Sequence, residues 1–221
     1  MTQKMIDQVE VDLCTGCAGI FLDDGEFESF TGVDPTTGLL RLSKFVKVLS
    51  RLNERATLDE LTGVYNRKFF NEFMRNVFEN ERRGPVTLIA IDIDHFKQFN
   101  SDHGHDGGDL VLQEVARVID MLLRTSRDDY LFRLGGEEFC LLLFGLDRQD
   151  SYYTAETVRR VVGSHPLKMK NGQTVYIHLS LGVALARPTD TPESIYKRAD
   201  ELLYQAKNTG RNRVVIEQEG Q

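Results

Sequence analysis

The chain has 221 residues, and its 27 lysines and arginines against 34 aspartates and glutamates give a formal net charge of −7 at pH 7. With 41% hydrophobic and 28% charged residues, the composition excludes wholesale disorder and fibrous classes. The apolar runs fall far short of the ~20 residues of a membrane span, and the acidic N-terminus lacks the apolar core of a signal peptide. An acidic chain is also a poor general nucleic-acid binder, because phosphate contacts need clustered lysine and arginine. We therefore expect a cytoplasmic protein that has neither a membrane nor a nucleic acid as partner.

Residues 1–38 are predicted to be loop-rich, because glycines and Pro35 interrupt their short apolar stretches. Cys14 and Cys17 have the CxxC spacing of a zinc knuckle, and the segment resembles half of a zinc-ribbon domain. Zinc needs four ligands, and Cys140 lies far along the chain on a predicted core strand. Three interpretations stay open: a relic with free thiols, which we favour slightly, a Zn²⁺ shared between two chains, or a natural chain that starts further upstream.

Residues 39–57 are predicted to form a helical stalk. Apolar side chains recur at intervals of three and four residues, at Leu42, Phe45, Leu49, Leu52 and Ala56. That spacing is typical of a two-stranded coiled coil, but it is too short to separate a coiled coil from one amphipathic helix packed on its own domain.

Residues 58–217 alternate between the periods of strands and helices, and residues 218–221 form a tail. The expected strands are 86–91, 130–134, 139–144, 175–186 and 214–216, and the expected helices are 110–124, 155–162 and 193–207. The run Gly135-Gly136-Glu137-Glu138 between two of the strands is a hairpin signal. Interleaved strands and helices with a hairpin predict an α+β fold, in which a mixed central sheet is covered by helices.

Carboxylates stand at two of these strand ends. Asp92 comes at the end of an apolar strand, and Glu137 and Glu138 lie on the predicted hairpin tip. Taken alone, Asp92 is explained as a surface acid where a strand emerges, and the Gly135–Glu138 tip as an exposed turn. If the two strands are neighbours, however, the acids converge and could hold two divalent cations, which activate a hydroxyl and stabilise charge on a phosphoryl group.

Five stretches, in matching order and spacing, resemble the GGDEF family of diguanylate cyclases, here in its GGEEF form. They are Asp59–Arg67, Asp92–Lys97, Asn100–Asp109, Gly135–Phe139 and Ala199–Asn212. The resemblance covers about residues 57 to 217 and implies a palm-like nucleotide cyclase fold. It also implies that the protein condenses two GTP molecules into cyclic di-GMP and releases two pyrophosphates.

The resemblance assigns the acids to metal binding and catalysis. Asp92, Glu137 and Glu138, with the backbone carbonyl of Ile93, would hold Mg²⁺ or Mn²⁺, two per active site. Either glutamate could assist deprotonation of the ribose 3′-hydroxyl, and the sequence does not choose between them.

The resemblance also assigns the substrate contacts. Asn100 and Asp109 would bond the guanine edge, whose N–H donors suit a carboxylate and an amide. Phe96 would line the base pocket. The triphosphate would be neutralised by basic side chains, namely Lys97, Lys207 and Arg211.

The family's product-inhibition site is an Arg-x-x-Asp sequence before the signature. Here Asp129 occupies the Asp position, but Ser126 stands in the Arg position. Because an arginine fork supplies much of the grip on a phosphate or a guanine, we expect no tight feedback inhibition.

Product formation in this family implies a homodimer, formed through the 39–57 helix and through catalytic domains that face each other. A coiled coil would raise the effective concentration of the partner domain.

The alternative is a catalytically silent domain that binds GTP or a partner. The presence of all the acids and of the substrate-facing residues favours the enzyme.

Overall fold

The computed structural model describes residues 2–6, 9–13, 20–21, 57–79, 84–123 and 129–217. The chain separates into two compact units, Met1–Thr57 and Leu58–Gln221. In the first unit, three strands form an antiparallel sheet: β1 (Thr2–Ile6), β2 (Val9–Leu13) and β3 (Ile20–Phe21). The segment expected to be loop-rich therefore contains strands. Cys14 and Cys17 lie outside the described residues, as does the predicted 39–57 helix apart from Thr57.

The second unit is built on one mixed sheet, as the sequence predicts. Its six strands are ordered β11-β10-β5-β7-β6-β4. They are β4 (Tyr65–Asn66), β5 (Val86–Ile93), β6 (Tyr130–Gly135), β7 (Glu138–Phe144), β10 (Leu179–Leu185) and β11 (Val214–Ile216). The pairs β4–β6 and β10–β11 are parallel and the other neighbours are antiparallel. Two further strands, β8 (Leu167–Lys168) and β9 (Thr174–Val175), form a separate small hairpin.

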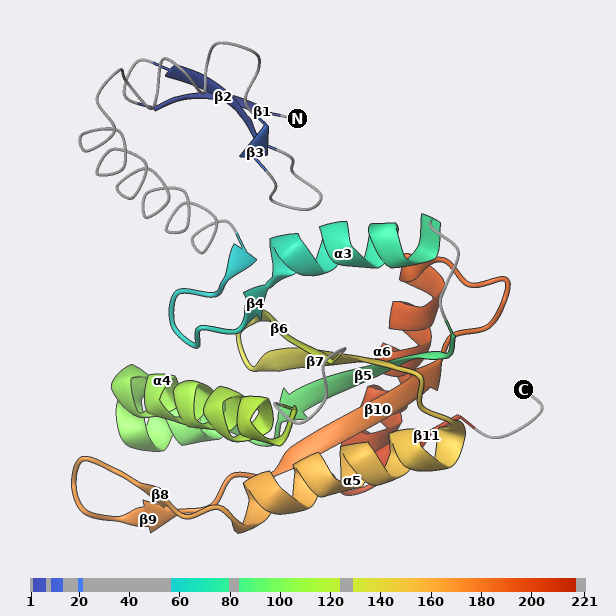
Figure 1. Cartoon of the computed structure of the whole chain (residues 1–221). Coiled ribbons are helices and arrows are strands. Elements are labelled where there is room, and N and C mark those ends of the chain that lie inside the picture. The colour runs from blue at the N-terminus through green and yellow to red at the C-terminus, as the bar shows by residue number, and fades with distance from the viewer. Residues whose placement is uncertain are drawn as a thin grey trace. The chain divides into compact units, whose positions relative to one another are not determined.

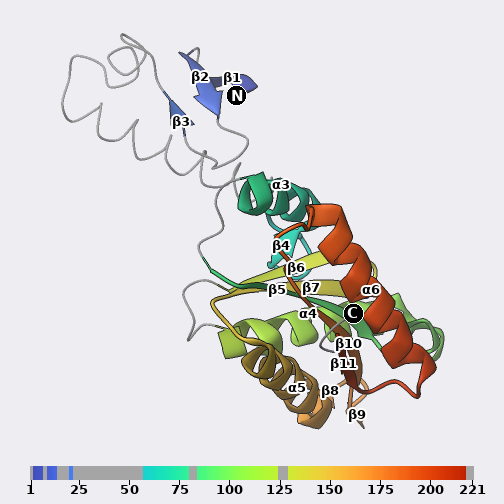
Figure 2. The same ribbon diagram turned by 90° about the vertical axis from the view of Figure 1, so that its right-hand side faces the viewer.

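Helices cover both faces of this sheet. They are α3 (Arg67–Glu79), α4 (Phe96–Leu123), α5 (Arg148–Ser164) and α6 (Pro192–Asn208). Figures 1 and 2 show α3 and α6 on one face and α4 and α5 on the other, and each face has its own hydrophobic core. All eight residues of β5 are buried, because a central strand covered on both sides presents both alternating faces to apolar cores. The predicted α+β architecture is confirmed.

The close packing of α6 on β10 depends on Gly182. A Cβ atom at this position would lie 2.2 Å from the carbonyl oxygen of Ala199 and 2.2 Å from the backbone nitrogen of Leu203. Glycine thus lets the helix backbone lie directly on the strand. This packing fixes where the C-terminal end of α6, which carries Lys207, meets the sheet.

Several elements differ from those expected. Helix α4 begins at Phe96 instead of residue 110, and it is kinked at Gly104, whose φ of 75° and ψ of 171° are not helical. The strand expected over 175–186 is divided into β9 and β10. Helix α3 and the short strands β4 and β8 were not expected from the sequence pattern.

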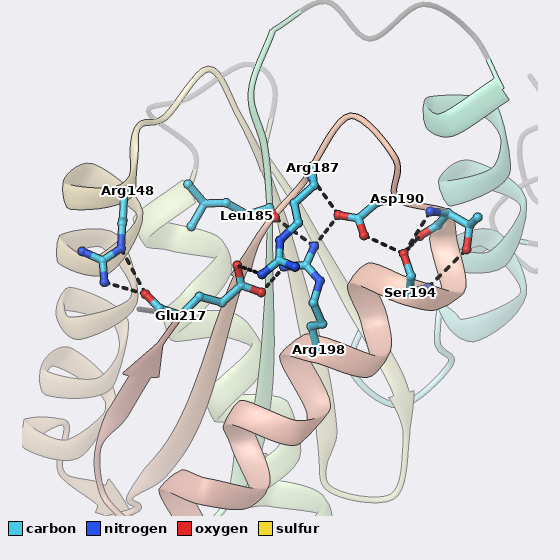
Figure 3. Close-up of polar contacts among 8 residues, drawn as sticks. Arg148, Leu185, Arg187, Asp190, Ser194, Arg198 and Glu217 are labelled. Atoms are coloured by element: carbon cyan, nitrogen blue, oxygen red, sulfur yellow. Dashed lines mark hydrogen bonds and ion pairs between the residues drawn. The ribbon is translucent and has the colours of Figure 1, made fainter. Parts of the chain in front are cut away.

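Figure 3 shows how the N-terminal half of α6 is tied to the chain around it. Arg198 donates hydrogen bonds to the carboxylates of Asp190 and Glu217 and, at 3.0 Å, to the carbonyl oxygen of Leu185. The side chains of Asp190 and Glu217 are only 7% and 16% exposed. A single guanidinium therefore binds two largely buried carboxylates, and Arg187 adds a longer ion pair to Glu217 at 3.6 Å.

Asp190 has further donors. Its carboxylate accepts from the backbone N–H of Arg187 at 2.7 Å and from Oγ of Ser194 at 2.6 Å. Burial acts to raise the pKa of Asp190, but these hydrogen bonds and the charge of Arg198 outweigh it and hold the pKa below its ordinary value. The carboxylate is thus kept ionised at neutral pH.

We expect Arg198→Met to lower the free energy of unfolding by about 3 kcal/mol at pH 7, because it removes the cation that two largely buried carboxylates share. Since the folded-state pKa of Asp190 is depressed, its contribution is present above the unfolded pKa of ~3.9 and is lost as the pH falls through the lower folded-state value. The difference between variant and wild type should therefore shrink in acid. Urea unfolding at pH 7 and at pH 3 measures both effects.

The matched control is Lys197→Met, which removes an exposed ion pair with Glu201 on the same helix. This change should alter stability by less than about 1 kcal/mol. Equal stabilities of the two variants at pH 7 would contradict the assignment to Arg198.

Candidate active site

The C-terminal end of β5 and the tip of the β6–β7 hairpin lie next to each other, where these central strands end. Asp92 lies directly opposite Glu138 in the antiparallel β5–β7 register. The backbone N–H of Ile93 lies 3.4 Å from the carbonyl oxygen of Glu137. Because directly opposite residues project from the same face of a sheet, Asp92 and Glu138 are on the face covered by α3 and α6.

Asp92 is a buried carboxylate with one cationic partner. The residue is 6% exposed, and its Oδ2 lies 2.7 Å from Nζ of Lys207. Burial is the main cause that raises the pKa of Asp92 to about 6; Lys207 opposes this effect, and the charges of Glu137 and Glu138 add to it. The carboxylate is therefore held where a further cation would be strongly favoured.

The hairpin tip places the two glutamates differently. Gly135 and Gly136 have positive φ values of 137° and 52°, which glycine adopts without steric cost. Glu137 is partly buried, whereas Glu138 is exposed, with its carboxylate 3.4 Å from a terminal nitrogen of Arg67.

Two arginines that sequence reasoning missed hold this tip. Arg133 donates from Nε and a terminal nitrogen to the carbonyl oxygen of Gly136, at 3.1 and 3.0 Å, and from its other nitrogen to Asp59 at 2.9 Å. Arg67 also donates to the carbonyl oxygen of Leu134. Arg67 ends the Asp59–Arg67 stretch and Arg133 stands two residues before the Gly135–Phe139 stretch, so their positions were a usable signal. Local sequence patterns do not, however, reveal partners so far away in the chain.

A second group of predicted residues meets at the start of α4. A Cβ at Gly108 would lie 1.8 Å from Oδ1 of Asn100 and 3.1 Å from Cζ of Phe96. Oδ1 of Asn100 is buried and has no hydrogen-bond partner among the described residues. A buried acceptor without a donor calls for a ligand that supplies one, and Asp109, exposed and adjacent to Gly108, offers a second acceptor.

The predicted basic residues are distributed around these two groups. Lys97 is exposed in the first turn of α4, and Arg211 is exposed in the turn that follows α6. Lys207 contacts Asp92. Of the predicted inhibition site, Asp129 is partly buried and Ser126 lies outside the described residues.

The oxygen ligands at the paired ends of β5 and β7 fit a divalent cation. Within the described ranges, no three His, Cys, Asp or Glu side chains are already gathered into a metal site. Mg²⁺ is typically held by one or two carboxylates together with substrate phosphates and water. Asp92, the carbonyl of Ile93 and the adjacent glutamates supply hard oxygen ligands of that kind.

Comparison with known proteins identifies the family. The model of the family described as diguanylate cyclase, GGDEF domain, matches residues 56–213. The chain belongs to the GGDEF family. Diguanylate cyclase VdcA of Vibrio cholerae is 38% identical over 178 residues, which are 80% of this chain and 51% of VdcA. Diguanylate cyclase DosC of Escherichia coli is 36% identical over 182 residues, which are 79% of this chain and 39% of DosC.

A solved structure supports the same family at the level of the fold. The coiled coil and GGDEF domain of DgcB from Caulobacter crescentus, in complex with c-di-GMP, superpose with a TM-score of 0.75 at 31% identity, over 82% of this chain and 96% of that one. The GGDEF chain described here spans about half the length of VdcA and less of DosC. In its described segments, no helix has the length and apolar character needed to cross a membrane.

Proposed function

We propose that this GGDEF protein is a diguanylate cyclase, which joins two GTP molecules into cyclic di-GMP and releases two pyrophosphates. The observation that carries the proposal is the meeting of Asp92 with the Glu137–Glu138 tip beside Lys207. The buried, unpaired oxygen of Asn100 gives independent support, because guanine carries N–H donors on the edge that this oxygen would accept from.

Binding and orientation of GTP fall to groups on α4 and α6. Asn100 and Asp109 accept hydrogen bonds from the guanine edge, and Phe96 lines the base pocket. Lys97, Lys207 and Arg211 neutralise the triphosphate. Lys207, which contacts Asp92 in this structure, turns its ammonium toward the phosphates when the nucleotide is present.

Asp92, Glu137, Glu138 and the backbone carbonyl of Ile93 would hold the divalent cations, Mg²⁺ or Mn²⁺, two per active site. When bound, these cations would lower the pKa of the attacking hydroxyl and stabilise charge on the α-phosphate. Glu137 or Glu138 accepts the proton from the ribose 3′-hydroxyl. The burial of Asp92 limits solvent at this edge and strengthens the electrostatic interactions there.

Each domain holds one GTP, so product formation requires two domains that face each other. The 3′-hydroxyl bound by one domain then attacks the α-phosphate bound by its partner. A homodimer joined through the 39–57 helix would supply this arrangement. The rate per chain should consequently rise with protein concentration until the dimer is saturated.

Incubation of the full chain with GTP and Mg²⁺, followed by chromatography of the nucleotides, tests the proposal. We expect cyclic di-GMP and pyrophosphate in a ratio of one to two, and no product from Glu137→Ala. Tight GTP binding without turnover at any protein concentration would favour the silent binding domain instead.

The absence of an arginine at position 126 predicts weak feedback. Cyclic di-GMP should not inhibit the wild-type protein at submicromolar concentration, and Ser126→Arg, which restores the Arg-x-x-Asp spacing with Asp129, should lower the inhibitory concentration about tenfold or more. Initial rates measured against added cyclic di-GMP test this. Submicromolar inhibition that Ser126→Arg leaves unchanged would contradict it.

A further inference from the structure

Asp94, two residues beyond Asp92, joins three separate parts of the chain. Its backbone N–H donates to the carbonyl oxygen of His178 at 2.9 Å. One carboxylate oxygen, Oδ1, accepts from Oγ of Ser180 at 2.6 Å. The other, Oδ2, accepts from the backbone N–H of Asn212 at 2.8 Å. Both oxygens are thus used by the protein itself.

The turn that Asp94 holds has an unusual backbone. Arg211 and Asn212 are consecutive and have positive φ values of 60° and 45°, a conformation that residues other than glycine rarely adopt. Such a conformation persists where the surroundings over-determine it. On one side the N–H of Arg211 bonds the carbonyl oxygen of Ala206 at 3.0 Å, and on the other Asp94 binds Asn212.

The side chain of Asn212 is fixed separately. Its Oδ1 accepts from Arg159 of α5 at 2.6 Å. Asp94 therefore binds the backbone of the turn, while Arg159 binds the side chain of Asn212. Ser180, the second partner of Asp94, is fully buried on β10, and it lies opposite Asp92 in the β5–β10 register.

The geometry points to Asp94 as a positioning residue that fixes the Gly210–Asn212 turn, and with it Arg211, against the strand end that carries Asp92. This inference rests on the proposed function, because it gives Arg211 the triphosphate as its ligand. Asp92 and Asp94 then have distinct tasks. Asp92 faces the cation and the substrate, while Asp94 sets the distance between that strand end and a phosphate-binding side chain.

The loss of Asp94 should weaken nucleotide binding through Arg211. In Asp94→Ala, the N–H of Asn212 and the hydroxyl of Ser180 lose their acceptors, and the strained turn can relax. In Asp94→Asn, the amide oxygen can accept from Asn212 while the amide N–H donates to Ser180. The asparagine variant should therefore retain most of the function even though it carries no charge.

The experiment measures binding of 3′-deoxyGTP in the presence of Mg²⁺ by calorimetry, since this analogue lacks the attacking hydroxyl and is not turned over. We expect Asp94→Ala to raise the dissociation constant about tenfold, as for the loss of a hydrogen bond to a charged group, and Asp94→Asn to raise it less than about threefold. In an Arg211→Ala background, Asp94→Ala should add little, because the two residues act as one unit. Ser180→Ala, which removes one bond only, should give an intermediate effect.

Each contrary outcome is distinct. If Asp94→Ala lowers the melting temperature but the folded variant binds the analogue as wild type does, Asp94 is a structural residue. The inference then fails, while the proposed function stands. If both Asp94 variants raise the Mg²⁺ requirement equally, Asp94 is a metal ligand, which also overturns it. If the wild-type protein does not bind the analogue, the proposed function and this inference fail together.

Discussion

Asp92→Asn should reduce the formation of cyclic di-GMP by about 10³-fold, the loss expected when a principal electrostatic group of an active site is removed. The amide keeps the size of the carboxylate and its place opposite Glu138. It carries no charge, however, and it is a poor ligand for a hard divalent cation. Initial rates at saturating GTP over a range of Mg²⁺ concentrations test this expectation.

The same variant should fold at least as well as the wild type. Asp92 is 6% exposed and has Lys207 as its cationic partner, and burial disfavours its charge enough to raise its pKa to about 6. Removing the charge removes that cost. A loss of activity that is accompanied by unchanged or higher thermal stability would separate a functional role from a structural one.

A matched control is Asp150→Asn, which makes the same chemical change in the exposed first turn of α5. It should leave the rate within about twofold of wild type, because surface substitutions away from special features change little. Cyclase activity that survives in Asp92→Asn at the level of this control would remove the metal assignment.

The strands were the part of the fold that the sequence pattern predicted best. The apolar run from Val86 predicted β5, because a strand buried on both faces is apolar throughout. The structure extends this strand to Ile93, so Asp92 lies within the sheet and is shielded from solvent. The Gly135–Gly136 pair likewise predicted the hairpin, since those two positions need positive φ.

One helix and the first half of another were hidden by their composition. Helix α3 has no acidic residue in its first turn and no basic residue in its last turn, so its main sequence signal is the N-cap Asn66, which accepts from the backbone N–H of Phe69 at 2.9 Å. The first half of α4 contains three glycines, of which Gly104 breaks the helical backbone. Glycine lowers intrinsic helix propensity, and packing of Phe96 and Val111 into the core stabilises the helix instead.

The candidate site was predicted residue by residue from the motifs, but the contacts that hold it were not. Arg133 and Asp59 are 74 residues apart in the chain, and Asp94 and Asn212 are 118 residues apart. No local period carries such pairings. They follow from the order of the strands, which brings the start of the domain beside the hairpin and the turn after α6 beside the end of β5.

Gly108→Ala should weaken binding of 3′-deoxyGTP by about 10- to 100-fold, the range that one methyl group can produce in a fitted pocket. The added Cβ would stand 1.8 Å from Oδ1 of Asn100, so the amide must rotate away from the position in which it would accept a hydrogen bond from guanine. The helix itself should tolerate the change, because alanine is the better helix former. Calorimetric titration with 3′-deoxyGTP and Mg²⁺ measures the effect.

The control is Gly163→Ala in α5, where the nearest atom to the new Cβ, Nδ1 of His178, is 3.4 Å away, so affinity should not change. The double variant Asn100→Ala/Gly108→Ala makes the test specific. If the methyl group acts by displacing the amide, Gly108→Ala will cost no further affinity once Asn100 has been truncated. If the two losses of affinity add, the methyl group obstructs the nucleotide itself. If Gly108→Ala binds the analogue as tightly as wild type does, the guanine does not lie against Asn100 and Gly108. Only the first result would show that Oδ1 of Asn100 binds the guanine, because an effect that acts through this side chain is lost when the side chain is truncated.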